Sequence, residues 1–133
     1  MITGSCLCGA IHYQVDHPID QLVFCHCSRC QKESGSAYNT VAIIPANTFS
    51  ITQGDHHLKA YDNCETYRQF CADCGTHLFS VPLKNNGVYI LRVGSLNTSI
   101  EPTKKVHVYT AFKAQWDSIC DNLPSFDEMP VSQ

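Results

Sequence analysis

Cys71-Ala72-Asp73-Cys74-Gly75 decides the fold of this chain, because its two cysteines stand at a separation from which both thiolates can hold one metal ion. A second pair, Cys6-Leu7-Cys8-Gly9, lies near the N-terminus. A glycine follows each pair and permits the left-handed or crowded backbone that closes such a turn. We expect backbone N–H groups in both turns to point at the sulfurs. The four cysteines together predict a tetrahedral, closed, structural zinc site made by Cys6, Cys8, Cys71 and Cys74.

Such a site ties the N-terminal edge of the fold to its middle. The free energy of zinc binding then becomes free energy of folding. The alternative is that these residues are separate core cysteines.

A third cluster, Cys25-His26-Cys27-Ser28-Arg29-Cys30, offers three thiolates within six residues. Three protein ligands with an exchangeable fourth position are typical of catalytic zinc. We therefore expect an open zinc site at Cys25, Cys27 and Cys30. The alternatives are a closed site, with His26, His77 or Cys64 as fourth ligand, and a thiol cluster without metal.

Zinc held by three thiolates is a weak Lewis acid toward a carbonyl and suits soft ligands. A substrate thiol in the fourth position would be deprotonated and held as a thiolate. Arg29 and Lys32, next to the cluster, are candidates for binding the carboxylates of a thiol substrate, and His26 is a third candidate. The alternative for the two cations is ordinary solvated surface charge.

Composition narrows the class of protein. The 133 residues are 44% hydrophobic and contain no run long enough to span a bilayer. The N-terminus lacks a basic stretch followed by an apolar one, so we expect no signal peptide and a cytoplasmic location. An odd number of cysteines, nine, then argues against a disulfide framework.

The formal net charge is −3, and two Zn²⁺ ions with seven bound thiolates would take it to roughly −6. The nine lysines and arginines are scattered along the chain. Nucleic-acid binding is therefore disfavoured.

The chain predicts a mostly β fold, an antiparallel sandwich or barrel-like arrangement of short strands rich in Val, Ile, Tyr, Phe and Thr. The expected strands are 10–15, 38–44, 49–53, 58–61, 66–70, 77–81, 88–93 and 106–109. Helical signal is weak, with one turn expected from Ser28, as N-cap, to Glu33. We expect a single zinc-binding domain over residues 2–126 and a C-terminal tail over 127–133, frayed near Gln133.

After Ala114 we expect an irregular segment packed by its aromatic residues, Trp116 and Phe126 among them. Cys120 in this segment is expected to be a small buried hydrophobe.

In combination, the motifs resemble the glutathione-dependent formaldehyde-activating enzyme family, whose domain is shared with centromere protein V. The matching stretches are Gly4-Ser5-Cys6-Leu7-Cys8-Gly9-Ala10-Ile11, Cys25-His26-Cys27-Ser28-Arg29-Cys30-Gln31-Lys32 with Ser34-Gly35, Arg68-Gln69-Phe70-Cys71-Ala72-Asp73-Cys74-Gly75 with Leu78, Gly94-Ser95-Leu96, Pro102, His107, Lys113, Trp116, Leu123-Pro124 and Phe126.

The resemblance implies a β-tent zinc fold with little helix. It also implies a structural site at Cys6, Cys8, Cys71 and Cys74, and a catalytic site at Cys25, Cys27 and Cys30. The family's namesake reaction joins formaldehyde to the glutathione thiol, gives S-hydroxymethylglutathione and belongs to the carbon–sulfur lyases. The chain departs from the family pattern at Asn63-Cys64, where a serine pair is common, and at Asn97, where an aspartate is common. Cys64 is a local replacement, a fourth zinc ligand or a reactive thiol.

These observations predict a lyase in which a zinc-bound thiolate of glutathione, or of a related low-molecular-weight thiol, attacks formaldehyde or another small aldehyde. Bringing the two molecules together would supply much of the rate gain. His26, Tyr38 and His77 are candidates for the general acid by residue type. The rival functions are a non-catalytic zinc module that binds protein partners, a lyase acting on a different sulfur compound, and nucleic-acid binding.

Overall fold

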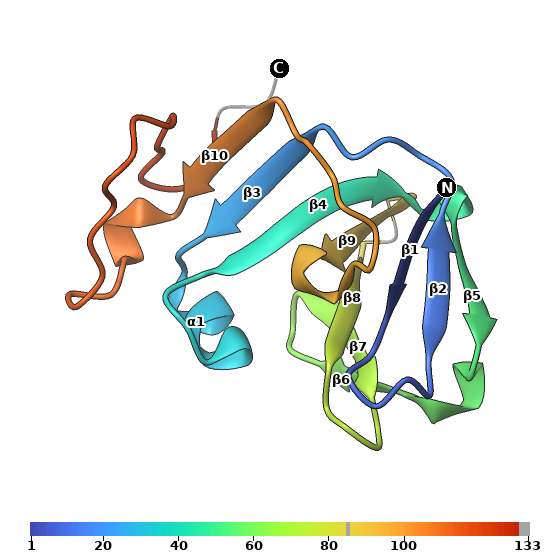
Figure 1. Ribbon diagram of the computed structural model, residues 1–133. Helices are drawn as coiled ribbons and strands as arrows, with labels where there is room; N and C mark the ends of the chain where they lie inside the picture. The colour runs from blue at the N-terminus through green and yellow to red at the C-terminus, as the bar shows by residue number, and fades with distance from the viewer. Residues whose placement is uncertain (85, 131–133) are drawn as a thin grey trace. The chain divides into compact units, whose positions relative to one another are not determined.

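The computed structural model of the protein describes residues 1–84 and 86–130, and these residues are mostly β (Figure 1). One α-helix, α1 (Ser28–Ser34), occurs in the described part of the chain. The described strands are β1 (Ile2–Ser5), β2 (His12–Val15), β3 (Gln21–Cys25), β4 (Asn39–Pro45), β5 (Phe49–Gln53), β6 (Leu58–Asp62), β7 (Thr66–Cys71), β8 (His77–Pro82), β9 (Val88–Arg92) and β10 (Lys104–Val108).

The chain forms two compact units. The first consists of Met1–Ile19 and Ala42–Ile100, and the second of Asp20–Val41 and the chain from Glu101 onward. The prediction of a single domain over residues 2–126 stays a prediction. Gln133, where we expected a frayed end, lies outside the described residues, as does the end of the predicted tail.

The first unit contains a three-stranded antiparallel sheet in the order β1-β2-β5 and the antiparallel strands β9-β8-β7-β6. Tyr13 on β2 is fully buried and stacks on Phe49, with ring centroids 5.1 Å apart. Phe49 in turn contacts Phe79 at 4.5 Å. Gly4 on β1 makes room for Tyr13, because a Cβ atom there would lie 2.2 Å from the tyrosine ring. Alternate inward residues of short strands therefore build this core.

In the second unit β3 lies between β10, to which it is parallel, and the first residues of β4, to which it is antiparallel. Figure 1 shows α1 where β3 ends and before β4 begins. Cys27 is the N-cap of α1, with extended backbone, and its sulfur accepts a hydrogen bond from Cys30 N. Gly35 closes the helix in the left-handed conformation. The predicted helix is confirmed, but its N-cap is Cys27, one residue before Ser28.

The predicted mostly β fold class is confirmed; among the strand pairs whose register the structure describes, β10–β3 is parallel and the others are antiparallel. All eight expected strands form, with ends within about two residues of those predicted. Two strands were missed, β1 and β3. Two expectations for the chain after Ala114 were wrong: Cys120 is exposed rather than buried, and Trp116 is 74% exposed rather than packed. Among the described residues no helix combines the length and apolar character that crossing a bilayer requires.

Candidate metal centres

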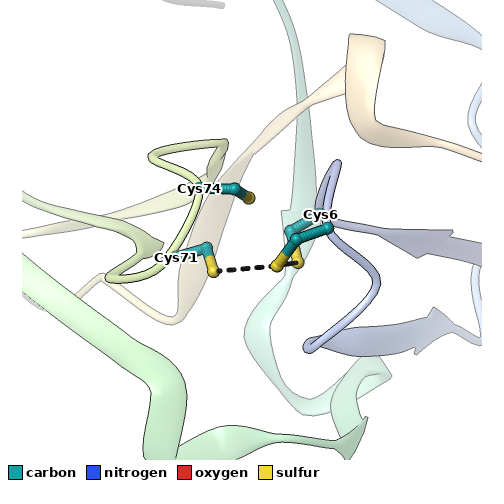
Figure 2. A group of neighbouring side chains, drawn as sticks. Cys6, Cys71 and Cys74 are labelled. Carbon is teal, nitrogen blue, oxygen red and sulfur yellow. Dashed lines mark hydrogen bonds between the residues drawn. The ribbon is translucent and has the colours of Figure 1, made fainter.

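The first cysteine cluster joins two turns of the first unit. The sulfurs of Cys6, Cys8, Cys71 and Cys74 all lie within 4.8 Å of one another. Figure 2 shows Cys6 on one loop facing Cys71 and Cys74 on another. Four sulfurs at 2.3 Å from a tetrahedral zinc ion would be about 3.8 Å apart. The separations of 3.6 Å for Cys6–Cys8 and 3.8 Å for Cys8–Cys71 fit that geometry.

The two glycines that follow these cysteine pairs are required by backbone conformation. Gly9 and Gly75 both have φ of +79°, which is strained for any side chain, and a Cβ at either would meet no atom within 4 Å. Gly75 N donates to Cys71 O at 2.8 Å, which closes the second turn. A backbone N–H also reaches a sulfur, from Ile11 N to Cys6 Sγ at 3.3 Å. The turn geometry expected from the sequence is thus present.

Thr76 connects the two turns, and sequence reasoning missed it. Its hydroxyl oxygen accepts a hydrogen bond from Leu7 N at 3.0 Å and lies 3.2 Å from Cys74 Sγ. Hydrogen bonding from this hydroxyl lowers the pKa of Cys74 to about 5. The only sequence signal is a hydroxyl residue directly after Gly75. Thr76 therefore both holds the turns together and favours the thiolate form of one candidate ligand, Cys74.

His57 holds the Cys71–Cys74 turn from outside. Its Nδ1 atom is 2.7 Å from Asp73 Oδ2, and its carbonyl oxygen accepts from Ala72 N at 2.9 Å. Both contacts fall on residues between the two cysteines. The turn is thereby attached to the 3-10 helix Asp55–His57 as well as to β7 and β8.

The second cluster forms where β3 passes into α1. Cys25 ends the strand, Cys27 caps the helix and Cys30 lies in its first turn. Their sulfurs all lie within 4.8 Å of one another. Within residues 1–84 and 86–130, no fourth cysteine, histidine or carboxylate atom joins this group. Three soft ligands converging in this way fit zinc or a similar thiophilic ion.

The three thiols share their protons unequally. Hydrogen bonding from Cys25, and then from Cys30, lowers the pKa of Cys27 to about 2. The same contact raises the pKa of Cys25 to about 11, and hydrogen bonding with Cys25 raises that of Cys30. Cys27 Sγ also accepts from Cys30 N at 3.3 Å. The contacts within the cluster thus favour the thiolate form of Cys27 over that of its two neighbours.

The predicted substrate-binding residues occupy different environments. Arg29 and Lys32 are exposed on α1 and, being three residues apart, lie on the same side of the helix. His26 is fully buried, and its Nε2 atom is 2.8 Å from Nδ1 of His107. Tyr38 is partly exposed, with its ring centroid 4.9 Å from that of His26. Burial also lowers the pKa of His26.

The positions that depart from the family pattern form turns and strand attachments. Asn63 Oδ1 accepts from Thr66 N at 2.8 Å, and Cys64 is exposed with φ of 76°. Asn97 donates to Ser5 Oγ at 3.0 Å, and its backbone N–H donates to Thr3 O. Cys64 belongs to neither cysteine cluster. His77, another proposed fourth ligand, packs its ring 6.3 Å from that of Phe70 and is likewise outside both clusters.

Two convergent sets of cysteines, in turns at the ends of strands, define a β-rich protein with two candidate thiolate metal centres. The chain belongs to the glutathione-dependent formaldehyde-activating enzyme family, whose sequence model matches residues 1–112. The predicted family is confirmed.

Curated relatives agree with this assignment. A Penicillium rubens protein named "Putative glutathione-dependent formaldehyde-activating enzyme" is 39% identical over 56 residues, which are 41% of this chain and 29% of the relative. A Phaeosphaeria nodorum protein of the same name is 36% identical over 56 residues, 41% of this chain and 30% of the relative. The chain thus spans less than a third of the length of these relatives.

A solved structure of a Rhodobacter sphaeroides protein has a similar fold. Its TM-score is 0.60 at 21% sequence identity, and the match covers 73% of this chain and 89% of that one. At this identity the likeness supports the fold alone.

Proposed function

We propose that this chain is an enzyme that joins formaldehyde, or another small aldehyde, to the thiol of glutathione or a related low-molecular-weight thiol. The reaction belongs to the carbon–sulfur lyase class. Family membership supports the reaction type. The observation that carries the proposal is the three-cysteine cluster, which gathers three soft ligands without a fourth in the described chain.

The two clusters take different roles in this proposal. Zinc at Cys6, Cys8, Cys71 and Cys74 would be fully ligated and structural. Zinc at Cys25, Cys27 and Cys30, when bound, supplies one open coordination position that favours the ionised form of an incoming thiol.

The side chains around the second cluster would bind and orient the thiol. Arg29 and Lys32 place two cations on one side of α1, beside the cluster, and glutathione carries two carboxylates for them to bind. Their positive charge also offsets the negative charge of three thiolates. Fixing the thiol in this way converts an encounter of two molecules into a reaction within one complex.

The bond changes need no oxidant or reductant. The thiol loses its proton, its sulfur bonds to the carbonyl carbon, the π electron pair moves to oxygen, and that oxygen takes up a proton. His26 is buried with Nε2 bonded to His107, so it is poorly placed to deliver the proton. Tyr38 lies in the same unit as the cluster and is partly exposed, so we assign it this donation.

Serine substitution at the second cluster tests the proposal. Cys27→Ser removes a ligand, and serine is itself a good N-cap, so α1 should persist. We expect the variant to stay folded, to bind one metal equivalent instead of two and to lose aldehyde–thiol condensation. NMR of the S-hydroxymethyl product would measure the condensation. Cys120→Ser, at an exposed cysteine outside both clusters, should keep both metals and full activity.

Condensation that survives in Cys27→Ser would refute a role for the cluster in catalysis. A protein with two metal equivalents that condenses no member of a thiol and aldehyde panel would instead be a non-catalytic metal module.

A further inference from the structure

Two histidines and a carboxylate form a hydrogen-bonded line that ends between two of the proposed metal ligands. Asp121 Oδ2 is 3.0 Å from His107 Nε2, and His107 Nδ1 is 2.8 Å from His26 Nε2. Both imidazoles are buried, whereas Asp121 is 42% exposed. His26 is the residue between Cys25 and Cys27. The line therefore connects the chain after Ala114 to the turn that carries the second cluster.

For neutral imidazoles, the carboxylate of Asp121 sets the order of donors and acceptors along this line. The hydrogen bond from His107 lowers the pKa of Asp121, so its carboxylate is ionised and can only accept. His107 must then carry a proton on Nε2 and, in its neutral form, accept at Nδ1. His26 in turn must donate from Nε2. One exposed carboxylate thereby selects the tautomer of both histidines.

The backbone polar groups of His26 are hydrogen-bonded to other elements. Its backbone N–H donates to Val108 O at 3.0 Å, and its carbonyl oxygen accepts from Gln31 Nε2 at 2.9 Å. Its Nδ1 atom is buried, lies 3.9 Å from Asp117 Oδ2, and has no hydrogen-bond partner in the described chain. Of the two imidazole nitrogens, Nε2 is thus hydrogen-bonded to His107, and Nδ1 is buried without a hydrogen bond to any described residue.

We propose that Asp121, acting through His107, is a positioning residue for the three-cysteine site: it fixes the ring of His26 away from the sulfurs and holds the Cys25–Cys27 turn in its metal-binding shape. The histidine nearest in sequence to the cluster then cannot take the fourth position, which stays available to a substrate thiol. This inference rests on the proposed binding of metal by Cys25, Cys27 and Cys30.

The wild-type protein provides a first test that needs no substitution. Nitrogen-15 NMR of the metal-loaded protein should show His26 and His107 as neutral rings protonated at Nε2. Protonation of His107 at Nδ1, or of His26 at Nδ1 in place of Nε2, would overturn the inference because either reverses the hydrogen-bond order.

The second test measures affinity for each metal equivalent by competition with a chelator. Asp121→Ala should lower the affinity of the three-cysteine cluster by about 10- to 100-fold, the effect usual for partners behind a metal ligand. Affinity at the four-cysteine cluster should not change. Asp121→Asn keeps an oxygen that can accept from His107 Nε2 and should restore most of the loss. Asp127→Ala, which removes the same charge from an exposed site in the same segment, should behave as wild type.

Unchanged affinity in Asp121→Ala, or an equal loss from both clusters, would overturn the inference. Neither readout involves an aldehyde or turnover. Failure here therefore leaves the proposed reaction standing, and failure of the reaction leaves the positioning role standing.

Discussion

Gly54 is the position at which a single methyl group should be most damaging. It lies between β5 and β6 with φ of +79°, and a Cβ atom there would be 1.8 Å from Ala10 O and 2.8 Å from Ala10 C. The left-handed conformation costs a non-glycine residue about 1–2 kcal/mol. The overlap is with backbone, which cannot rotate away, and overpacking of this kind adds about 1–3 kcal/mol or more. Gly54→Ala should therefore lose about 2–5 kcal/mol of a total stability of about 5–15 kcal/mol.

Gly87→Ala provides the matched control, because Gly87 has φ of +78° and a Cβ atom there would meet nothing within 4 Å. The Gly87→Ala variant should lose only the stability that corresponds to the left-handed backbone conformation, about 1–2 kcal/mol. The unfolding temperatures of the two variants at the same saturating zinc concentration should differ by about 3–12 °C. Because Ala10 directly follows the Cys6–Gly9 turn, Gly54→Ala should also weaken metal binding at the four-cysteine cluster. Equal unfolding temperatures for the two variants would refute the reasoning, since the clash would then carry no energy.

Two further predictions concern hydrogen bonds to acidic groups. Thr76→Val keeps the shape of the side chain but removes the hydroxyl that contacts Cys74 Sγ and Leu7 N. We expect about a tenfold loss of metal affinity at the four-cysteine cluster and metal release at higher pH, measured by chelator competition across pH; an unchanged release curve would contradict this. The carboxylate of Asp20 accepts hydrogen bonds from the hydroxyl and the backbone N–H of Thr103. These bonds, the hydroxyl's most of all, hold the pKa of Asp20 below its ordinary value of 3.8. The stabilisation from these hydrogen bonds is complete above pH 3.8 and is lost as pH falls through the lower folded-state pKa. The difference in urea midpoint between wild type and Asp20→Asn should therefore be constant from pH 7 to 5 and shrink below about pH 3.8. A difference that persists at pH 3 would rule out the carboxylate as its source.

Local patterns in the sequence predicted most of the strands. The segments from Phe49 to Val93 alternate or concentrate β-branched and aromatic residues, and each forms a strand where expected. β1 was missed because Ile2-Thr3-Gly4-Ser5 is short and contains a glycine. That glycine is explained only by Tyr13, whose ring occupies the space a side chain would fill. β3 was missed because its apolar residues run directly into the cysteine cluster, which dominates that part of the sequence.

The two sites differ in how far sequence reasoning could reach. Spacing predicts which cysteines share a turn, because a separation of only two or three positions brings the sulfurs together whatever the rest of the chain does. It says nothing about Thr76, whose hydroxyl meets the other turn only after folding. Likewise, His107 and Asp121 reach His26 through the pairing of β10 with β3, which joins segments about 80 residues apart. Parallel pairing of this kind leaves no local trace in the sequence.

Both clusters consist of cysteines, but the cysteines are distributed differently along the chain. This difference explains the two proposed roles. The four-cysteine cluster takes its sulfurs from turns 63 residues apart, so metal there closes a long loop and stabilises the first unit. The three-cysteine cluster takes all its sulfurs from one strand-to-helix turn, so metal there closes almost no loop and adds little to the fold. A site that contributes little to stability can leave one coordination position to a substrate. The nearest residue able to fill that position, His26, is bonded to His107 instead. In this proposal, topology makes one centre structural, and a hydrogen bond keeps the other open.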